Sequence, residues 1–479
     1  MIHSFNYCVE HTKEIGTVVE SREFLVKVSG LDSAVIGEGV TFETGEHGRV
    51  MSIESNLINV LMLSKTLLKP KTKAARTGSQ LSVSAGDGIL GHVVNALGHS
   101  ISIRRFPSEL HEKKPIESQP IGITGRTQVT RFFQTGVTIS DLLIPLGYGQ
   151  RELIIGDRKT GKTHFIQQIM ISQARMGIIC IYCAIGKRKT EIKSMEEFLE
   201  NRFVQHNTII VAADSNQSPG EIFIAPYTAM SLAEYFRDQG KDVCLILDDL
   251  TTHAKYYREI GLLAGYFPGR ESYPGDIFHI HSKLLERAGC FIINKKQATI
   301  TCLPIAESIG GDMTGYIQTN LMSITDGHMF FDTDLFYQGR RPPINVFLSV
   351  TRIGRQTQSP LMRDVGAQLL KLLKSHEDIK RFLRFGPELS DEIRKRYAVG
   401  ENLIHFFDQI GFDPIPVNLQ LVFASLIWQG KWDEDKFKVL IKSYEEHKHF
   451  HTAVEDFVKK ANNFDELNEL VKRYFHVKV

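Results

Sequence analysis

Residues 156–163 constrain this chain more than any other stretch, because they fit the phosphate-binding pattern G-x-x-x-x-G-K-[ST]. An apolar run at residues 152–155 precedes them and is typical of a short buried strand. In residues 165–170, which follow them, apolar side chains recur at helical spacing. A loop between a strand and a helix N-terminus presents backbone N–H groups and a favourable dipole to phosphate. The sequence therefore predicts a nucleotide-binding protein.

Each part of this loop has an expected role. The glycines let the backbone close around phosphate oxygens, Lys162 would reach the outer phosphates, and the hydroxyl of Thr163 would ligate Mg²⁺. We therefore expect ATP or ADP with Mg²⁺ at this site. The residues expected to bind it are Gly156, Asp157, Arg158, Lys159, Thr160, Gly161, Lys162 and Thr163.

A second apolar run, residues 243–247, ends in two carboxylates, Asp248 and Asp249. In P-loop proteins such a strand lies near the phosphate-binding loop and places its aspartate near the metal ion. We therefore expect Asp248 to hold Mg²⁺ through water.

The whole sequence limits the class of protein. At 479 residues, we expect two to four domains. The 57 basic and 55 acidic residues nearly balance, which argues against a nucleic-acid-binding protein. The N-terminus lacks signal-peptide and transit-peptide character, and no apolar run approaches the ~20 residues that span a bilayer. If the protein works at a membrane, we expect a partner to hold it there.

Two pairs of residues resemble metal or redox sites. Cys180 and Cys183 have C-x-x-C spacing, but their apolar run is typical of a central strand, so we expect buried thiols and a reducing compartment. His279 and His281 stand two positions apart on an expected helix and would therefore point to different faces. We expect these histidines to pack or to lie on the surface.

Changes of pattern along the chain predict three domains. Short alternating runs with glycine-containing turns predict a β-barrel of some six strands within residues 1–80. Uninterrupted apolar runs, among them 208–212, 243–247 and 290–293, predict strands buried in a mostly parallel α/β sheet within residues 81–358. Amphipathic helical spacing predicts a C-terminal helical bundle in residues 359–479.

Several motifs resemble those of the alpha subunits of F-type rotary ATP synthases. The likeness covers roughly residues 15 to 430 and is highly specific because the motifs occur together in the expected order. The matching stretches are residues 76–78, 90–98, 149–163, 268–276, 284–288, 323–327, 335–337 and 349–354, with a weaker match at 384–386 and 398–403. The resemblance implies an N-terminal β-barrel, a RecA-like P-loop domain and a C-terminal helical domain.

The resemblance also implies that this chain does not catalyse hydrolysis itself. Catalytic beta subunits carry a Glu after the next strand, where it activates the attacking water, and alpha subunits carry Gln. This chain has Lys187, which is charged near neutral pH and has no lone pair to accept a proton. Glu191 lies four residues further on, but the family gives no precedent for its use. We expect a pocket that binds nucleotide and hydrolyses it slowly or not at all.

Other residues match functional positions of the family. The counterpart of Arg352 reaches the catalytic site of the adjacent beta subunit as an arginine finger, and Ser323 matches a position near that shared site. Phe336, Arg341 and Gln409 match positions that line the adenine and phosphate pocket of the subunit itself. The family has Gln at two positions where this chain differs, in the loop at Lys159 and near the base at Gly411.

The resemblance implies beta-type partners in a 3:3 ring, a central gamma-type shaft and, indirectly, an ion-translocating membrane rotor. We therefore expect a peripheral protein at the cytoplasmic face of the cell membrane. Only about fifteen residues precede the expected barrel, where the usual alpha subunit has a longer arm for the peripheral stalk, and the region from Trp428 diverges. These departures leave open a divergent, alpha-like paralogue in a specialised rotary ATPase that does not make ATP.

Three other functions remain as alternatives. A homohexameric export ATPase of the type III secretion or flagellar kind shares the loop and the finger, but it keeps the glutamate that Lys187 replaces. A ring-shaped RNA translocase resembling terminator Rho would need an RNA-binding fold and basic inward loops. A purely structural ring subunit would not need the intact residues 156–163.

Overall fold

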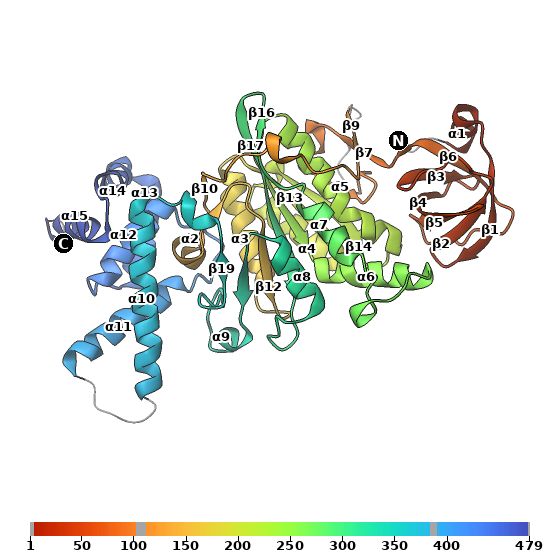
Figure 1. Cartoon of the computed structure of the whole chain (residues 1–479). Coiled ribbons are helices and arrows are strands. Elements are labelled where there is room, and N and C mark those ends of the chain that lie inside the picture. Colours follow the sequence, from red (N-terminus) through yellow and green to blue (C-terminus); the bar gives the residue numbers. More distant parts are fainter. Residues whose placement is uncertain (1–3, 102–111, 384–389, 478–479) are drawn as a thin grey trace.

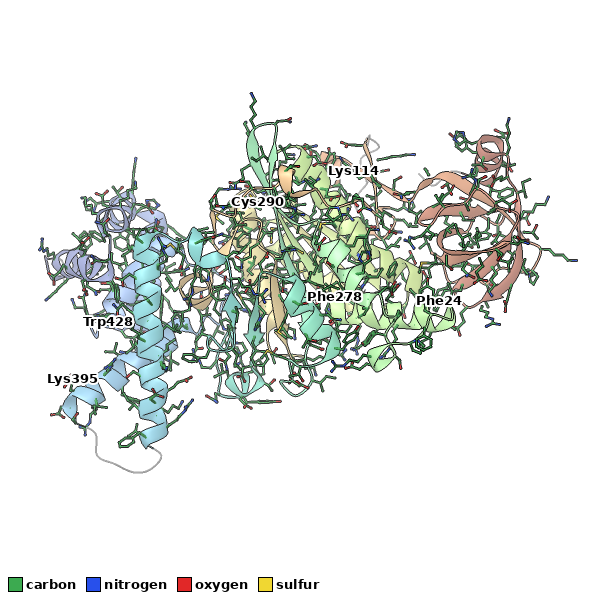
Figure 2. All side chains as sticks on the ribbon, in the orientation of Figure 1. Phe24, Lys114, Phe278, Cys290, Lys395 and Trp428 are labelled. Atoms are coloured by element: carbon green, nitrogen blue, oxygen red, sulfur yellow. The ribbon has the colours of Figure 1, made fainter. Side chains whose placement is uncertain are left out.

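The computed structural model describes residues 4–101, 112–383 and 390–477. Three parts follow one another along the length of the molecule (Figure 1). A β-barrel lies at one end, an α/β sheet in the middle and a group of helices at the other end. Side chains fill all three parts, from Phe24 in the barrel to Trp428 among the C-terminal helices (Figure 2). The predicted fold class is confirmed.

The barrel contains six antiparallel strands, closed in the order β1-β2-β5-β4-β3-β6. The strands are β1 (Gly16–Arg22), β2 (Leu25–Ser29), β3 (Glu38–Phe42), β4 (His47–Glu54), β5 (Leu57–Met62) and β6 (Lys73–Gln80). A short helix, α1 (Phe5–Thr12), contacts β6 and β3 and buries Cys8. Closure leaves no edge strand of the barrel unpaired.

The central sheet follows the order β19-β18-β12-β17-β15-β13-β14-β8. Every pair from β18 to β8 is parallel, and only the edge strands β19 and β16 pair antiparallel. The strands are β8 (Val93–Asn95), β12 (Glu152–Gly156), β13 (Ile179–Lys187), β14 (Thr208–Asp214), β15 (Val243–Asp248), β16 (Gly289–Ile293), β17 (Lys296–Glu307), β18 (Gly327–Phe331) and β19 (Val350–Thr351). Two short antiparallel pairs lie outside this sheet, β7 (Ser82–Ala85) with β9 (Glu112–Pro115) and β10 (Phe132–Phe133) with β11 (Leu146–Gly147).

One strand differs from its prediction. The run at residues 290–293 is apolar enough for a buried parallel strand, but β16 forms an antiparallel hairpin with β17. Its Ile292 side chain is exposed. The apolar pattern alone cannot distinguish a central strand from an edge hairpin.

Helices cover both faces of the sheet, as the uninterrupted apolar strands require. Alternate residues of β13 enter two different cores: Ile181 and Cys183 pack with α5 and α6, whereas Cys180 and Tyr182 pack with α3 and α4. The first core continues into the barrel, and the second continues into the C-terminal helices. The helices of this part are α2 (Thr138–Leu143), α3 (Lys162–Arg175), α4 (Lys189–Asn201), α5 (Pro219–Asp238), α6 (Leu250–Leu263), α7 (Ile277–Leu285), α8 (Tyr316–Ile324) and α9 (Thr333–Tyr337).

The C-terminal helices pack against α2 and against one another through apolar side chains of the second core. They are α10 (Pro360–Leu383), α11 (Asp391–Phe407), α12 (Val417–Trp428), α13 (Glu434–Glu446), α14 (Lys448–Lys460) and α15 (Phe464–Val477). In the part of the chain that the structure describes, no helix combines the length and the apolar character needed to cross a membrane.

The predictions for the two residue pairs agree with the structure. Cys180 and Cys183 are free, buried thiols within β13. On α7, His279 is exposed, whereas His281 is buried with its Nε2 atom 3.2 Å from Nδ1 of His253. The described residues contain no group of three potential metal ligands from His, Cys, Asp and Glu.

A buried ion pair connects α7 to α5. The guanidinium of Arg287, which follows α7 and is 1 % exposed, donates to Glu234 Oε2 at 2.6 Å and to Ser231 Oγ at 2.8 Å. Its Nη1 atom donates to the Ile116 carbonyl at 2.8 Å. These contacts are buried. Without the cation, Glu234 keeps only the hydrogen bond from Ser118 Oγ at 3.0 Å and the longer contact from Arg237 at 3.4 Å.

We expect Arg287→Ala to lower the free energy of unfolding by about 3–5 kcal/mol, because it leaves a buried carboxylate without its main partner. Urea unfolding followed by circular dichroism measures this change. Arg22→Ala is the matched control, since Arg22 also pairs with a glutamate, Glu20, but is 66 % exposed. Equal effects of the two substitutions would contradict a structural role for the buried pair.

Candidate nucleotide-binding site

The phosphate-binding loop lies at the carboxyl end of β12, between the neighbouring strands β17 and β18. Gly156 is required there, because a Cβ atom at this position would stand 2.5 Å from the Phe331 carbonyl oxygen. Gly161 has φ +90°, a left-handed conformation that glycine adopts without strain, and α3 begins at the next residue. The strand, loop and helix predicted from the sequence are therefore present in the predicted order.

The Asp157 carboxylate holds the phosphate-binding loop in place through hydrogen bonds. Its carboxylate accepts hydrogen bonds from Ser308 Oγ at 2.6 Å, from the Gly311 N–H at 3.0 Å and from Thr333 Oγ1 at 2.9 Å. Burial alone would raise the pKa of Asp157, but these hydrogen bonds outweigh it and hold the pKa below its usual value. Asp157 thus fixes the loop to the ends of β17 and β18.

Lys162 lies inside the loop that it is expected to serve. Its Nζ atom donates to the carbonyls of Gly156 and Asp157, both at 2.6 Å. Burial lowers the pKa of Lys162. The ammonium and the exposed Thr163 line a pocket of about 450 Å³. The loop residues Arg158, Lys159 and Gly161 line the same pocket, whereas the Thr160 hydroxyl donates to the Asp157 carbonyl.

The carboxyl ends of β13 and β15 complete the pocket. Lys187 Nζ lies 2.7 Å from Asp248 Oδ1 and 3.6 Å from Asp249 Oδ2. Burial alone would lower the pKa of Lys187, but the two carboxylates raise it above its usual value, so the side chain is an ammonium ion. Lys187 and Asp248 therefore meet at the pocket, although 61 positions separate them in the chain.

Tyr182 is a third member of this cluster, and the sequence did not single it out. Its hydroxyl donates to Asp248 Oδ2 at 2.7 Å. Burial and the neighbouring Asp248 carboxylate raise the pKa of Tyr182, so the hydroxyl keeps the proton that it donates. Asp249 has a different task, because its carboxylate accepts from the Thr252 N–H at 2.6 Å and caps α6.

Glu191 also lines the pocket, but it has a local structural task. Its carboxylate accepts the Arg188 N–H at 2.9 Å and caps the N-terminus of α4. A glutamate held by its own helix end is not free to approach a substrate without uncapping that helix.

Phe336, Arg341 and Gln409 lie together, although none of them lines the pocket of the phosphate-binding loop. The Arg341 guanidinium carbon stands 3.9 Å from the centroid of the Phe336 ring, and the Gln409 N–H donates to the Arg341 carbonyl at 2.6 Å. The Gln409 side chain bonds to backbone on both sides, accepting from the Thr138 N–H at 2.7 Å and donating to the Gly136 carbonyl at 3.1 Å. Gln409 therefore connects the C-terminal helices to the nucleotide domain.

The segment after Gln409 packs on α3. The His164 ring stacks on Phe412 with centroids 4.2 Å apart, and Gln168 Nε2 donates to the Gly411 carbonyl at 2.8 Å. No sequence pattern singled out His164 or Phe412. On its other side, this segment lines a larger cavity of about 920 Å³, which contains none of the loop residues.

Arg352 and Ser323 lie near the amino ends of β12 and β18, whereas the phosphate-binding loop follows the carboxyl end of β12. Arg352 follows β19, whose Thr351 pairs with Gly327 at the start of β18, and Gly327 pairs with Glu152 at the start of β12. The exposed guanidinium donates to the carbonyls of Thr325 at 3.2 Å and Met322 at 3.5 Å. Ser323 is exposed in the same segment. Among residues 4–101, 112–383 and 390–477, no carboxylate forms an ion pair with Arg352.

The fold and the pocket define a P-loop nucleotide-binding protein with a β-barrel on one side and helices on the other. The ATP synthase alpha/beta family nucleotide-binding domain matches residues 136–351. The ATP synthase subunit alpha of Caldanaerobacter subterraneus subsp. tengcongensis is 40 % identical over 422 residues, which are 88 % of this chain and 83 % of that protein. The subunits alpha of two Helicobacter pylori strains are each 37 % identical over 437 residues, 91 % of this chain and 86 % of theirs. The chain therefore belongs to the ATP synthase alpha subunit family.

We expect Lys162→Ala to weaken ATP binding by about 10- to 100-fold, because hydrogen bonds to charged groups contribute ~1.5–3 kcal/mol. Titration calorimetry on the isolated chain measures the dissociation constant. Arg175→Ala, at the exposed end of the same helix, is the control and should leave binding unchanged. Unaltered affinity in Lys162→Ala would mean that the nucleotide phosphates do not bind at this loop.

Proposed function

We propose that this chain is the nucleotide-binding, non-catalytic alpha-type subunit of a hexameric F-type rotary ATPase. It binds Mg·ATP or ADP in its own pocket and supplies Arg352, with Ser323 nearby, to the catalytic site of an adjacent beta-type subunit. The observation that carries the proposal is that the phosphate-binding loop and Arg352 lie at opposite ends of the strands of one sheet. The phosphate-binding loop follows the carboxyl end of β12, and Arg352 adjoins its amino end.

The position of Lys187 supports a non-catalytic pocket. A general base must accept a proton from the attacking water, and an ammonium ion paired with Asp248 at 2.7 Å has no free lone pair. Glu191, which lies four residues after Lys187, caps α4. The pocket thus has the parts that hold phosphates and lacks a placed base at the position that faces them.

The residues of the pocket fit a magnesium ion in part. The Thr163 hydroxyl is an exposed oxygen donor on the first turn of α3, as Mg²⁺ prefers. Both Asp248 oxygens already accept a hydrogen bond, from Lys187 and from Tyr182. Each oxygen keeps a second lone pair, so Asp248 would hold the metal through a bound water. A bound Mg²⁺ would neutralise phosphate charge.

Arg352 cannot serve the pocket of its own chain. Arg352 lies beside the start of β12, and the loop begins four residues further along this strand. At the usual rise per residue, the two are separated by roughly 13 Å along the strand. Its exposed guanidinium is held by backbone carbonyls, which fix its direction without neutralising its charge. A positive charge in this state suits an arginine finger that stabilises phosphoryl transfer in a neighbouring subunit.

The family membership supports the partners proposed here. They are beta-type catalytic subunits in a 3:3 ring and a central gamma-type shaft, with the ion-translocating membrane rotor reached indirectly. The ring would therefore work as a peripheral assembly at the cytoplasmic face of the cell membrane. Whether the complex makes ATP or drives a specialised process, the roles of the pocket and of Arg352 are the same.

We expect the isolated chain to bind ATP in the presence of Mg²⁺ and to release almost no phosphate, because its pocket has no placed base. Titration calorimetry and a steady-state phosphate assay on one purified sample measure both properties. Rapid turnover by the chain alone would instead favour the homohexameric export ATPase.

We expect Arg352→Ala to lower the turnover of the reconstituted ring by roughly 10³-fold or more, as loss of an arginine finger does. Arg352→Lys should restore little, since an ammonium lacks the planar fork of the guanidinium. ATP affinity of the alpha-type pocket should stay unchanged, which separates this residue from Lys162. Steady-state hydrolysis with a wild-type beta-type partner provides the measurement.

Arg355→Ala is the matched control, because Arg355 is exposed three residues further on and should leave turnover unaltered. Size-exclusion chromatography checks that each ring assembles. If rings with Arg352→Ala hydrolyse ATP within a few-fold of the wild-type rate, this chain has no finger and serves assembly only.

A further inference from the structure

Lys187 places a fixed positive charge at the base of the nucleotide pocket. Its Nζ atom contacts Asp248 at 2.7 Å and lies 3.6 Å from Asp249, and the two carboxylates are 5 % and 3 % exposed. The Lys187 side chain itself is 21 % exposed and lines the pocket together with Lys162 and Thr163. The ammonium therefore stands between two buried carboxylates and the space where phosphates are proposed to bind.

In a P-loop site, a metal ion binds close to the groups that Lys187 contacts. The divalent cation lies between the carboxylate of the neighbouring strand and the phosphate oxygens, next to the hydroxyl of the loop. Lys187 is already bound to the carboxylate on that side, and it shares the pocket with the Thr163 hydroxyl. An ammonium ion has three donors, so it can bond to a carboxylate and to phosphate oxygens together.

The other charged side chains of the pocket also favour an anionic ligand. Five basic and four acidic side chains line it. Two of the acidic side chains, Asp248 and Asp249, are balanced in part by Lys187, and Glu307 is paired with Arg158 at 2.9 Å. The basic side chains of Lys159 and Arg188 also line the pocket, where they can attract an anion. A triphosphate that enters without a metal ion therefore meets a lining with one more basic than acidic side chain.

We infer that Lys187 supplies much of the positive charge that Mg²⁺ supplies in other P-loop sites, so that this pocket binds metal-free nucleoside triphosphate nearly as well as its magnesium complex. The inference rests on the nucleotide binding proposed above and adds the ionic form of the ligand. It concerns binding only and involves no chemical step.

Titration of the isolated chain with ATP, once with excess Mg²⁺ and once with EDTA, tests the inference by calorimetry. For the wild-type chain, we expect the two dissociation constants to agree within about threefold, which is less than 1 kcal/mol. A loss of affinity of about tenfold or more on chelation would overturn the inference. Failure to bind ATP under either condition would instead contradict the proposed nucleotide site.

Variants identify the residue responsible. Lys187→Gln should leave binding of the magnesium complex measurable and weaken binding of metal-free ATP by about tenfold or more, because one positive charge is lost beside the phosphates. Lys187→Arg keeps the charge and should retain the wild-type ratio. Lys189→Gln removes a charge two residues away, on a side chain that is 71 % exposed and does not line the pocket, and should change nothing.

Circular dichroism at increasing temperature shows whether Lys187→Gln is folded, since this substitution removes a partner of two buried carboxylates. If Lys187→Gln does not fold, the wild-type ratio and the Lys187→Arg ratio decide the question without it. Equal ratios in the wild-type chain and folded Lys187→Gln would mean that Lys187 only compensates the carboxylates and does not serve the nucleotide.

Discussion

Burial of a parallel sheet on both faces is the constraint that the rest of this structure depends on. With α3 and α4 on one face and α5 and α6 on the other, polar side chains can reach a ligand only where the strands end. At the carboxyl edge, β12 continues into the phosphate-binding loop, β13 ends at Lys187 and β15 ends at Asp248. At the amino edge, the antiparallel strand β19 brings Arg352 to the start of β18. Under the proposed function, one sheet carries two sites that face away from each other, as a subunit between two neighbours in a ring requires.

The sequence was sufficient wherever a local pattern determines the local structure. The loop at residues 156–163, the alternating barrel strands and the spacing of His279 and His281 are read from neighbours in the chain, and the structure agrees. The hairpin strand β16 shows the limit of such reading, because its apolar run resembles that of a buried strand while Ile292 is exposed. The sequence pattern indicates how apolar a segment is. Whether that segment becomes a central strand or an edge strand depends on the strands with which it pairs.

The contacts that give the pocket its character depend on strand order and register. Lys187 meets Asp248 because β13 lies directly beside β15, with Ala184 opposite Asp248, and no spacing in the sequence encodes this neighbourhood. Tyr182 reaches the same carboxylate for the same reason. The stacking of His164 on Phe412 depends on the packing of a C-terminal segment against α3, across 248 positions of the chain. A single sequence supplies the groups, and the tertiary fold determines which of them meet.

The environment of Lys187 also explains why its side chain cannot be exchanged freely. Asp248 and Asp249 are nearly fully buried, and a buried carboxylate needs a hydrogen-bond donor or a cation to remain charged. Burial and mutual repulsion already raise the pKa of Asp249, even with the ammonium of Lys187 nearby. A glutamate at this position would place a third carboxylate in the same corner and remove the cation that compensates the other two. Under the proposed function, Lys187 disfavours a catalytic base in two ways. It stands where such a base would stand, and it stabilises two carboxylates that a base would repel.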